Sequence, residues 1–397
     1  MNLRDLAEIK RRLNPDKRNP SVICGYYADY LGNPITSFRL AVGMLAEQEN
    51  EKYMALFKKA LSGQIGQSLM PIGFPEETPE QMEIFEKLMA ARDSGLQDED
   101  AVCFLFEHVI AGLRAEHPDM QSVQDAQTAN NWLILLLHDT LDVRRRGADG
   151  EIDAENSDRS FSYVLCAICP VKQAKPALRY DPEDSIFHDR TLEWLASAPT
   201  LGFLFPLFED GAADVHSLLF FSKDRNEAHR EFLQASFRME AVMPAAEQTE
   251  TFQSVLSQSL GTDCSLEVMQ EMQETVSAMM EERQKDREAE PLMLTGQDVA
   301  QVLTESGVPE ERVEAFQEGF DQVFGAGTVL PAVNIVPSKQ FRVELPGVSI
   351  KADPDHRDLL ETRVIDGRSY LLIPIEGEIE VNGQPVFAPK VAKADGQ

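Results

Sequence analysis

The stretch from Phe161 to Phe221 most constrains the fold, because its apolar density sets it apart in an otherwise acidic chain. It opens with FSYVLCAICPVK and continues with GFLFPLF and HSLLFF. Short apolar runs bounded by turn residues are typical of strands buried in a sheet. We therefore expect Phe161–Val171 to be a buried strand, and Leu201–Phe208 with Val215–Ser222 to form a hairpin.

The rest of the first 240 residues adds strands and helices to this centre. Trp132–Val143 reads as a further strand, and Val22–Asp29 with Ile35–Ala41 flank LGNP as a hairpin. Helices are expected at 46–61, at 98–113 and after Thr78, which has the sequence of a capping box with Gln81 at N3. The predicted fold class is α+β: an antiparallel sheet with helices packed against one face.

The chain of 397 residues is long enough for two or three domains. Composition shifts at Pro244, and acidic helices follow, including a helical pair at 295–324 that starts at a Thr295 cap. Asp366-Gly367 and Asn382-Gly383 are tight-turn signals between short β runs. We predict an α+β domain at 1–240, an acidic helical segment at 241–328, a small β module at 329–388 and a tail at 389–397.

The charge limits the partners that the chain can bind. There are 37 basic and 67 acidic residues, a net charge of −30, and residues 61–160 and 241–328 carry −13 and −14 of it. Such a field repels phosphate backbones and anionic headgroups. The N-terminal helix is basic but reads as an amphipathic helix with a solvated face. We expect no nucleic-acid binding, and no membrane span because no apolar run approaches about 18 residues.

Cysteine usage and the first residues indicate the compartment. The start MNLRDLAEIK is charged and lacks an apolar core, so we expect no signal peptide. Five irregularly spaced cysteines favour a reducing compartment, and we expect a cytoplasmic location. Cys166 and Cys169 form the one CxxC, but side chains three apart on a strand point to opposite faces. We therefore predict buried structural cysteines, no metal and no cofactor.

No catalytic motif can be recognised in the sequence. There is no P-loop, no dinucleotide turn, no GxSxG and no HExxH. His138-Asp139, with His108 upstream, is more simply read as the polar end of a strand than as a metal phosphohydrolase site. Catalytic residues are therefore not assigned. If the chain is an enzyme, we expect a pocket at the N-terminal sheet, formed by these residues: Tyr163, Arg179, Tyr180, His188 and His216.

A methionine stripe is the preferred position for a partner surface. Met269, Met272, Val276 and Met279 follow one another at helical spacings of three, four and three. Methionine adapts to partner grooves, but it also fills cores. The core interpretation is favoured, because this helix must bury one of its faces.

Motifs along nearly the whole chain resemble an uncharacterised bacterial family, domain of unknown function 4317, which is common in Firmicutes. The resemblance rests on FSYVLCAICPVK, on GFLFPLFEDGAADVHSLLFFSKD and on further motifs in the same order: LSGQIGQSL, TFQSVLSQSLGTDCS, LTESGVPEE and ETRVIDGRSYLLIPIEGEIEVNG. It implies a cytoplasmic bacterial protein of about this length. It implies no activity and no catalytic residues.

Two classes of function follow from these observations. The first is a non-enzymatic protein–protein interaction or regulatory factor, supported by the acidic helices, the methionine stripe and the lack of a recognisable catalytic set. The alternative is an enzyme of unrecognised type with its pocket in the N-terminal α+β domain, because catalytic geometry need not be local in sequence. A nucleic-acid mimic, suggested by the net charge, is a third idea.

Overall fold

The computed structural model divides into two compact units, Met1–Glu250 with Glu282–Pro291, and Thr251–Glu281 with Leu292–Gln397. The structure describes residues 1, 3–14, 22–74, 78–118, 130–143, 159–174, 178–189, 193–209, 212–285, 290–336, 341–353, 356, 359–375, 379–381 and 384–386. Among the described helices, none is both long and apolar enough to cross a membrane.

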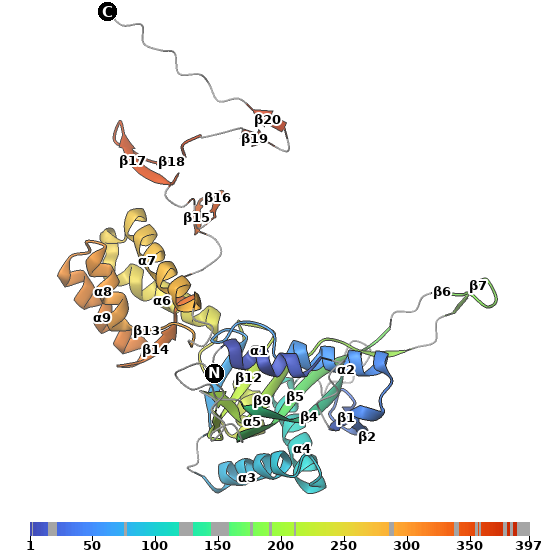
Figure 1. The fold of residues 1–397 in the computed structure, drawn as a ribbon. Helices are drawn as coiled ribbons and strands as arrows, with labels where there is room; N and C mark the ends of the chain where they lie inside the picture. Colours follow the sequence, from blue (N-terminus) through green and yellow to red (C-terminus); the bar gives the residue numbers. More distant parts are fainter. Residues whose placement is uncertain are drawn as a thin grey trace, which may run out of the picture. The chain divides into compact units, whose positions relative to one another are not determined.

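The first unit is built on an eight-stranded antiparallel sheet (Figure 1). The strand order is β2-β1-β4-β5-β9-β12-β3, and β8 pairs with the end of β5. These strands are β1 (Val22–Ala28), β2 (Pro34–Ala41), β3 (Leu69–Gly73), β4 (Asn131–Val143), β5 (Arg159–Gln173), β8 (Trp194–Ala196), β9 (Leu201–Phe205) and β12 (Ser217–Ser222). Two separate hairpins lie between sheet strands along the chain. They are β6 (Leu178–Asp181) with β7 (Ile186–Asp189), and β10 (Leu207–Glu209) with β11 (Ala212–Asp214).

The strands predicted from the apolar runs are confirmed, and their register explains their composition. Alternate residues of β5 enter two different cores, with Val164 and Cys166 on one face and Leu165 and Ala167 on the other. A strand that is buried on both faces reads as a continuous apolar run instead of an alternating one. The sheet is therefore covered on both sides.

The expectation that helices pack against one face is wrong, because both faces carry them. On one face lie α1 (Leu3–Arg12) and α2 (Glu47–Ala60), and on the other α3 (Pro79–Asp93), α4 (Glu99–Glu116) and α5 (Arg230–Phe237) (Figure 1). Leu6 and Ile9 of α1 belong to the first core, and Leu105 and Val109 of α4 to the second. The α+β class itself is confirmed.

Capping sequences correctly predicted where two helices begin. Thr78 accepts a hydrogen bond from the backbone of Gln81, whose side chain accepts one from the backbone of Thr78, so the capping box of α3 is complete. The same reciprocal pair forms between Thr295 and Asp298 at the start of α8. Such reciprocal bonds satisfy amide groups that have no partner inside the helix.

The second unit packs its helices around a core of its own. It contains most of α6 (Ala245–Leu260) and α7 (Leu266–Lys285), then β13 (Met293–Thr295), α8 (Gly296–Glu305), α9 (Glu310–Phe324), β14 (Val329–Pro331) and α10 (Ala332–Ile335). Phe316 and Phe320 of α9 are fully buried in this core. The predicted β module at 329–388 begins with the residues of β14, but β14 pairs with β13 of the helical unit.

The C-terminal β region consists of three two-stranded hairpins. They are β15 (Phe341–Leu345) with β16 (Val348–Ala352), β17 (Glu361–Ile365) with β18 (Arg368–Leu372), and β19 (Ile379–Val381) with β20 (Gln384–Val386). The turn of the second hairpin is Asp366-Gly367, as predicted, and both residues have positive φ. Asn382-Gly383 and the tail at 389–397 lie outside the described residues.

Candidate functional site

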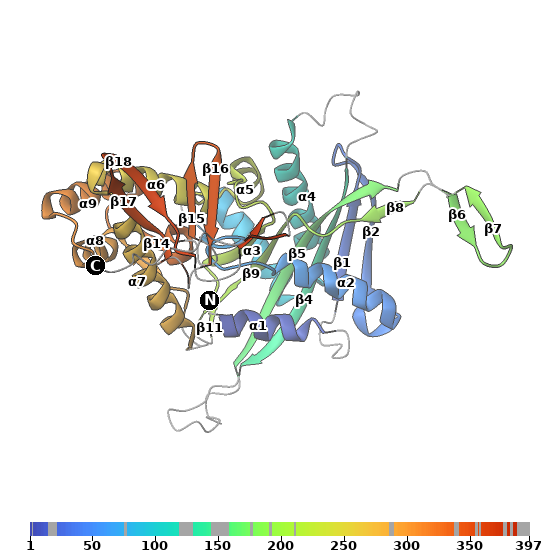
Figure 2. The ribbon, with the colours of Figure 1, turned by 90° about the horizontal axis from the view of Figure 1, so that it is seen from above.

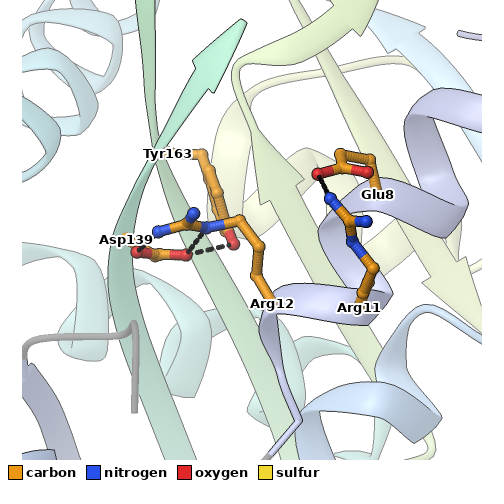
Figure 3. A network of polar contacts seen from close by, with 5 residues as sticks. All are labelled: Glu8, Arg11, Arg12, Asp139 and Tyr163. Atoms are coloured by element: carbon orange, nitrogen blue, oxygen red, sulfur yellow. Dashed lines mark hydrogen bonds and ion pairs between the residues drawn. The ribbon is translucent and has the colours of Figure 1, made fainter. Parts of the chain in front are cut away.

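A buried ion pair joins the N-terminal helix to the sheet (Figure 3). Arg12 donates from Nε and Nη2 to the two carboxylate oxygens of Asp139, at 2.5 and 2.9 Å. The hydroxyl of Tyr163, on the neighbouring strand β5, donates to Asp139 Oδ2 at 3.0 Å. The carboxylate is 3% exposed and Tyr163 is fully buried. We call these three residues the Asp139 cluster.

The Asp139 cluster is saturated, which argues against a chemical role. Burial, together with the negative charge of Asp139 and the hydrogen bond to it, raises the pKa of Tyr163 well above its ordinary value. The phenol therefore remains protonated at neutral pH and cannot act as a base. The cluster fastens α1 to the sheet, whereas the neighbouring Glu8–Arg11 pair is on the surface of the same helix (Figure 3).

A second polar cluster lies on the opposite face of the sheet, where α4 and α5 meet the end of β12. His229 contacts Glu116 through Nδ1 and Ser222 Oγ through Nε2, the latter at 2.8 Å. His229 precedes α5 with a left-handed backbone, at φ 50° and ψ 41°. Ser222 is fully buried, and its hydroxyl donates to the backbone oxygen of Asp224 at 2.6 Å. We call Glu116, Ser222 and His229 the His229 cluster.

The His229 cluster has the connectivity of a serine–histidine–acid triad, but its hydrogen bonds run in the wrong direction. In a working triad the serine donates its proton to the imidazole. Here Ser222 donates to Asp224 and therefore accepts from His229 Nε2. A ring nitrogen that donates a hydrogen bond to the serine oxygen cannot at the same time accept the serine proton. The geometry is that of a clamp between three elements.

Sequence reasoning missed the His229 cluster, because its members are far apart in the sequence. Its members lie at 116, 222 and 229, on two helix ends and one strand end. His229 occurs in a polar loop, SKDRNEAHR, that resembles any solvated connection. The one local hint is that histidine, like asparagine and aspartate, is enriched in the left-handed backbone that precedes α5.

The residues predicted to form a pocket are not gathered by the structure. Tyr163 is buried in the Asp139 cluster, on the face that carries α1 and α2. His216 precedes β12 and stacks on Phe85 of α3, which covers the opposite face. The other three residues, Arg179, Tyr180 and His188, belong to the β6–β7 hairpin.

The β6–β7 hairpin pairs with no other described strand (Figure 2). Tyr180 lies opposite Phe187, and their ring centroids are 5.3 Å apart. Residues directly opposite in an antiparallel pair share a face, as do residues two apart on one strand. Leu178, Tyr180 and Phe187 therefore form one face, which we call the aromatic face, and Asp189 is at the register position opposite Leu178. The exposed fractions of the three apolar side chains are 70%, 50% and 61%.

The other face of the hairpin is polar, apart from Ile186. Arg179 lies opposite His188, and Asp181 opposite Ile186. Arg179 forms an ion pair with Asp181 at 3.4 Å, and His188 contacts Asp184 at 3.3 Å. Arg179 and His188 are thus on the side of the hairpin opposite to Tyr180.

The methionine stripe is divided between core and surface. Met272 and Val276 are buried in the core of the second unit, and Met269 packs against it. Met279 is 36% exposed. Two of the four side chains are therefore inaccessible to a partner in this structure, as a core role requires.

The CxxC cysteines point to opposite faces, as the strand period predicts. Cys166 lies in the core under α3, α4 and α5, and Cys169 in the core under α1 and α2. Burial raises the pKa of Cys169 to about 12, and burial together with the charge of Cys169 raises that of Cys166 well above its usual value. Neither is a thiolate at neutral pH. Among the described residues, no group of three or more His, Cys, Asp or Glu side chains could hold a metal ion.

The fold defines an α+β protein with an antiparallel sheet covered on both faces by helices, followed by a helical unit and β hairpins. A family model, domain of unknown function DUF4317, matches residues 1–384. The chain therefore belongs to this family, as the resemblance of its motifs indicated. No curated protein shows significant similarity to the chain.

Proposed function

We propose that the chain is a cytoplasmic bacterial protein that acts without catalysis, by binding a partner protein through the aromatic face of the β6–β7 hairpin. The observation that carries this proposal is the exposure of Leu178, Tyr180 and Phe187 on one face. Aromatic side chains of this kind dominate the binding energy of protein interfaces. Their exposure to water in an otherwise well-packed unit calls for a covering partner.

The concentration of exposed apolar side chains supports the choice of this element. The described part of the first unit exposes eleven large apolar side chains, and six of them fall within residues 178–195. These six are Leu178, Tyr180, Ile186, Phe187, Trp194 and Leu195. Scattered surface hydrophobics are normal, whereas a cluster in a short segment is typical of an interaction site. The five cysteines, all free, support a reducing compartment.

The experiment compares capture by the tagged full chain with capture by two single variants. Phe187→Ser removes the centre of the aromatic face, and Ile186→Ser removes a similarly exposed side chain from the polar face. Baits are cross-linked mildly in the native host, and captured proteins are identified by mass spectrometry. Each candidate is then purified and its affinity measured. We expect Phe187→Ser to weaken binding about 30-fold or more, as removal of an interface aromatic does.

The matched control decides the outcome. Retention of binding by Ile186→Ser, with loss in Phe187→Ser, supports the aromatic face. Equal binding by all three proteins would contradict it, and circular dichroism of the variants establishes that the fold is unchanged.

The alternative, an enzyme, has one observation in its favour, which is the His229 cluster. Full burial of Ser222 and its donation to the backbone of Asp224 oppose a nucleophilic role. A fluorophosphonate probe, which labels activated serines, discriminates the two functions. We expect no labelling of the wild-type chain. Labelling that disappears in Ser222→Ala would establish the enzyme instead.

A further inference from the structure

We propose that β2, at one edge of the sheet, pairs antiparallel with β2 of a second copy of this chain, about a two-fold axis at Phe38. Among the described strands, β2 pairs with β1 alone, so it ends the sheet. An edge strand presents backbone N–H and C=O groups that fit one kind of partner, which is another extended strand. This contact lies outside the aromatic face and goes beyond the proposed function.

Both faces of β2 are accessible, which lets another strand approach. Six of its eight residues are exposed. The other two, Phe38 and Leu40, are half-buried against the core under α1 and α2. The inner strand β5, by contrast, is buried on both faces. The helices therefore cover the centre of the sheet and leave β2 open.

The opposite edge of the sheet is closed. β3 carries Pro71 at its centre, opposite Leu219 of β12. Proline is tolerated in an edge strand where its nitrogen faces away from the ladder, so the outer side of β3 lacks a donor there. The loop before β3 also covers its start, where Gly66 N donates to Leu69 O at 2.8 Å. With one open edge per chain, pairing ends at a dimer and does not continue into a fibre.

The charge of β2 selects the register. The pairing of β2 with β1 skips Ile35 and is regular from Thr36 to Ala41. Directly opposite residues share a face, so the axis of two identical strands passes beside a residue, here Phe38 or Arg39 in the middle of the regular part. Arg39 is the one charged residue of β2, and an axis there would set it against its own copy. Like charges directly opposite each other are destabilising, which leaves Phe38.

The axis at Phe38 gives a pairing in which β2 is complementary to itself. The two Phe38 rings lie opposite each other, and Arg39 of each copy lies opposite Ser37 of the other. Aromatic cross-strand pairs stabilise a sheet. The contact is small, because only the regular part of β2 takes part. We therefore expect a weak dimer, with a dissociation constant on the order of 10–100 µM.

The first test reverses the charge opposite Arg39 and measures the mass of the purified full chain by sedimentation equilibrium at increasing concentration. Ser37→Glu places a carboxylate opposite each Arg39, and it should tighten the dimer about threefold or more. Ser37→Arg places a guanidinium there, and it should weaken the dimer by a similar factor. Both substitutions are at an exposed position of the free chain.

Two variants serve as matched controls. Thr36→Glu introduces the same charge one residue away, on the other face and opposite Leu40 of the second copy, so it should not tighten the dimer. Phe187→Ser changes the aromatic face and should leave the dissociation constant unchanged. Circular dichroism of each variant establishes that the fold is unchanged.

Hydrogen exchange of the wild-type chain tests the same contact without a substitution. When the concentration rises through the dissociation constant, peptides that cover residues 34–41 should exchange more slowly, because new backbone hydrogen bonds protect their amides. Peptides that cover residues 69–73, at the closed edge, should show no change. Slower exchange at 69–73 with none at 34–41 would contradict the inference.

Three further outcomes overturn the inference. The first is a wild-type chain that stays monomeric to about 1 mM. The second is a dimer that responds in the same direction to Ser37→Glu and Ser37→Arg, because the contact then does not place Ser37 opposite Arg39. The third is a dimer that is lost in Phe187→Ser, which would move the contact to the aromatic face. None of these results depends on capture of a partner protein, so the proposed function stands or fails separately.

Discussion

The Asp139 and His229 clusters occupy opposite faces of one sheet and perform the same task with different chemistry. Each fastens helical segments to a strand through a carboxylate and a nitrogen-bearing side chain that contacts it. In the Asp139 cluster the cation is a guanidinium, which is charged at every physiological pH, and it binds both carboxylate oxygens. In the His229 cluster the partner is an imidazole, which contacts one carboxylate oxygen through Nδ1.

The two clusters also differ in how completely their carboxylates are satisfied. Asp139 accepts three hydrogen bonds from two side chains. Glu116 Oε1 contacts His229, but Glu116 Oε2 is buried and has no hydrogen-bond partner among the described residues. A buried network is most stabilising when every member is satisfied, and breaking a buried ion pair is costly. We therefore expect the Asp139 cluster to be the more sensitive of the two to mutation.

Asp139→Asn should reduce the free energy of unfolding more than any other variant of the two clusters. The substitution keeps the shape of the side chain but directs an amide group at Arg12, so a largely buried guanidinium loses its counter-charge. We expect the free energy of unfolding to fall by about 3–5 kcal/mol. Urea denaturation of the full chain, followed by far-UV circular dichroism, measures it.

Replacing all three residues of the Asp139 cluster should lower the free energy of unfolding less than Asp139→Asn does. The triple variant Arg12→Met, Asp139→Leu, Tyr163→Phe leaves no buried polar group behind, and apolar replacement of a buried ion pair is often nearly neutral. We expect it to be more stable than Asp139→Asn. A triple variant that is as unstable as the single one would show that specific hydrogen bonds, and not an uncompensated charge, determine the effect.

His229→Ala should have the second-largest effect and lower the free energy of unfolding by about 2–3 kcal/mol. It leaves the Glu116 carboxylate buried without its partner, and it replaces a residue type that is enriched in left-handed backbone with one that is not. His229→Asn separates the two contributions, because asparagine tolerates this backbone but is too short to bridge Glu116 and Ser222. The same urea titration should place it between wild type and alanine. Equal stability of the two variants would mean that backbone strain contributes nothing.

Features of the molecule encoded by neighbouring residues could be predicted from the sequence. The capping boxes at Thr78 and Thr295 depend on residues three apart, and the strands β4 and β5 on continuous apolar runs. The opposite orientation of Cys166 and Cys169 follows from the strand period of two. Each of these rules operates within a few residues.

Features that depend on the position of distant segments could not be predicted. The sequence predicted an amphipathic N-terminal helix, with Leu3, Leu6, Ile9 and Leu13 inward. Leu3 is 50% exposed, and nothing in the sequence indicates which face of the sheet α1 would cover. Likewise, Arg12 and Asp139 are 127 residues apart. Arg179, Tyr180 and His188 were expected in one pocket with Tyr163 and His216, yet the hairpin sets Tyr180 on the face opposite to Arg179 and His188.

Tyr163→Phe should lower the free energy of unfolding less than Asp139→Asn or His229→Ala. It tests the Asp139 cluster by the pH dependence of stability. Losing one hydrogen bond to a charged group should cost about 1.5 kcal/mol at pH 7. Because the folded-state pKa of Tyr163 is raised, the unfolded chain releases the phenol proton first as the pH rises. The stabilisation from this group is therefore complete below about pH 10 and declines above it.

The alkaline part of the stability profile isolates this contribution. Urea denaturation from about pH 8 to about pH 11 should show the free energy of unfolding falling less steeply for Tyr163→Phe than for wild type. Tyr26 and Tyr53, whose pKa values burial also raises, are present in both proteins and cancel in the difference. Arg11→Ala, which breaks the surface Glu8–Arg11 pair of the same helix, is the control and should change stability by at most about 0.5 kcal/mol at any pH. Parallel profiles for wild type and Tyr163→Phe would mean that the phenol ionises as readily in the folded chain as in the unfolded one, and that the Asp139 cluster is open to water.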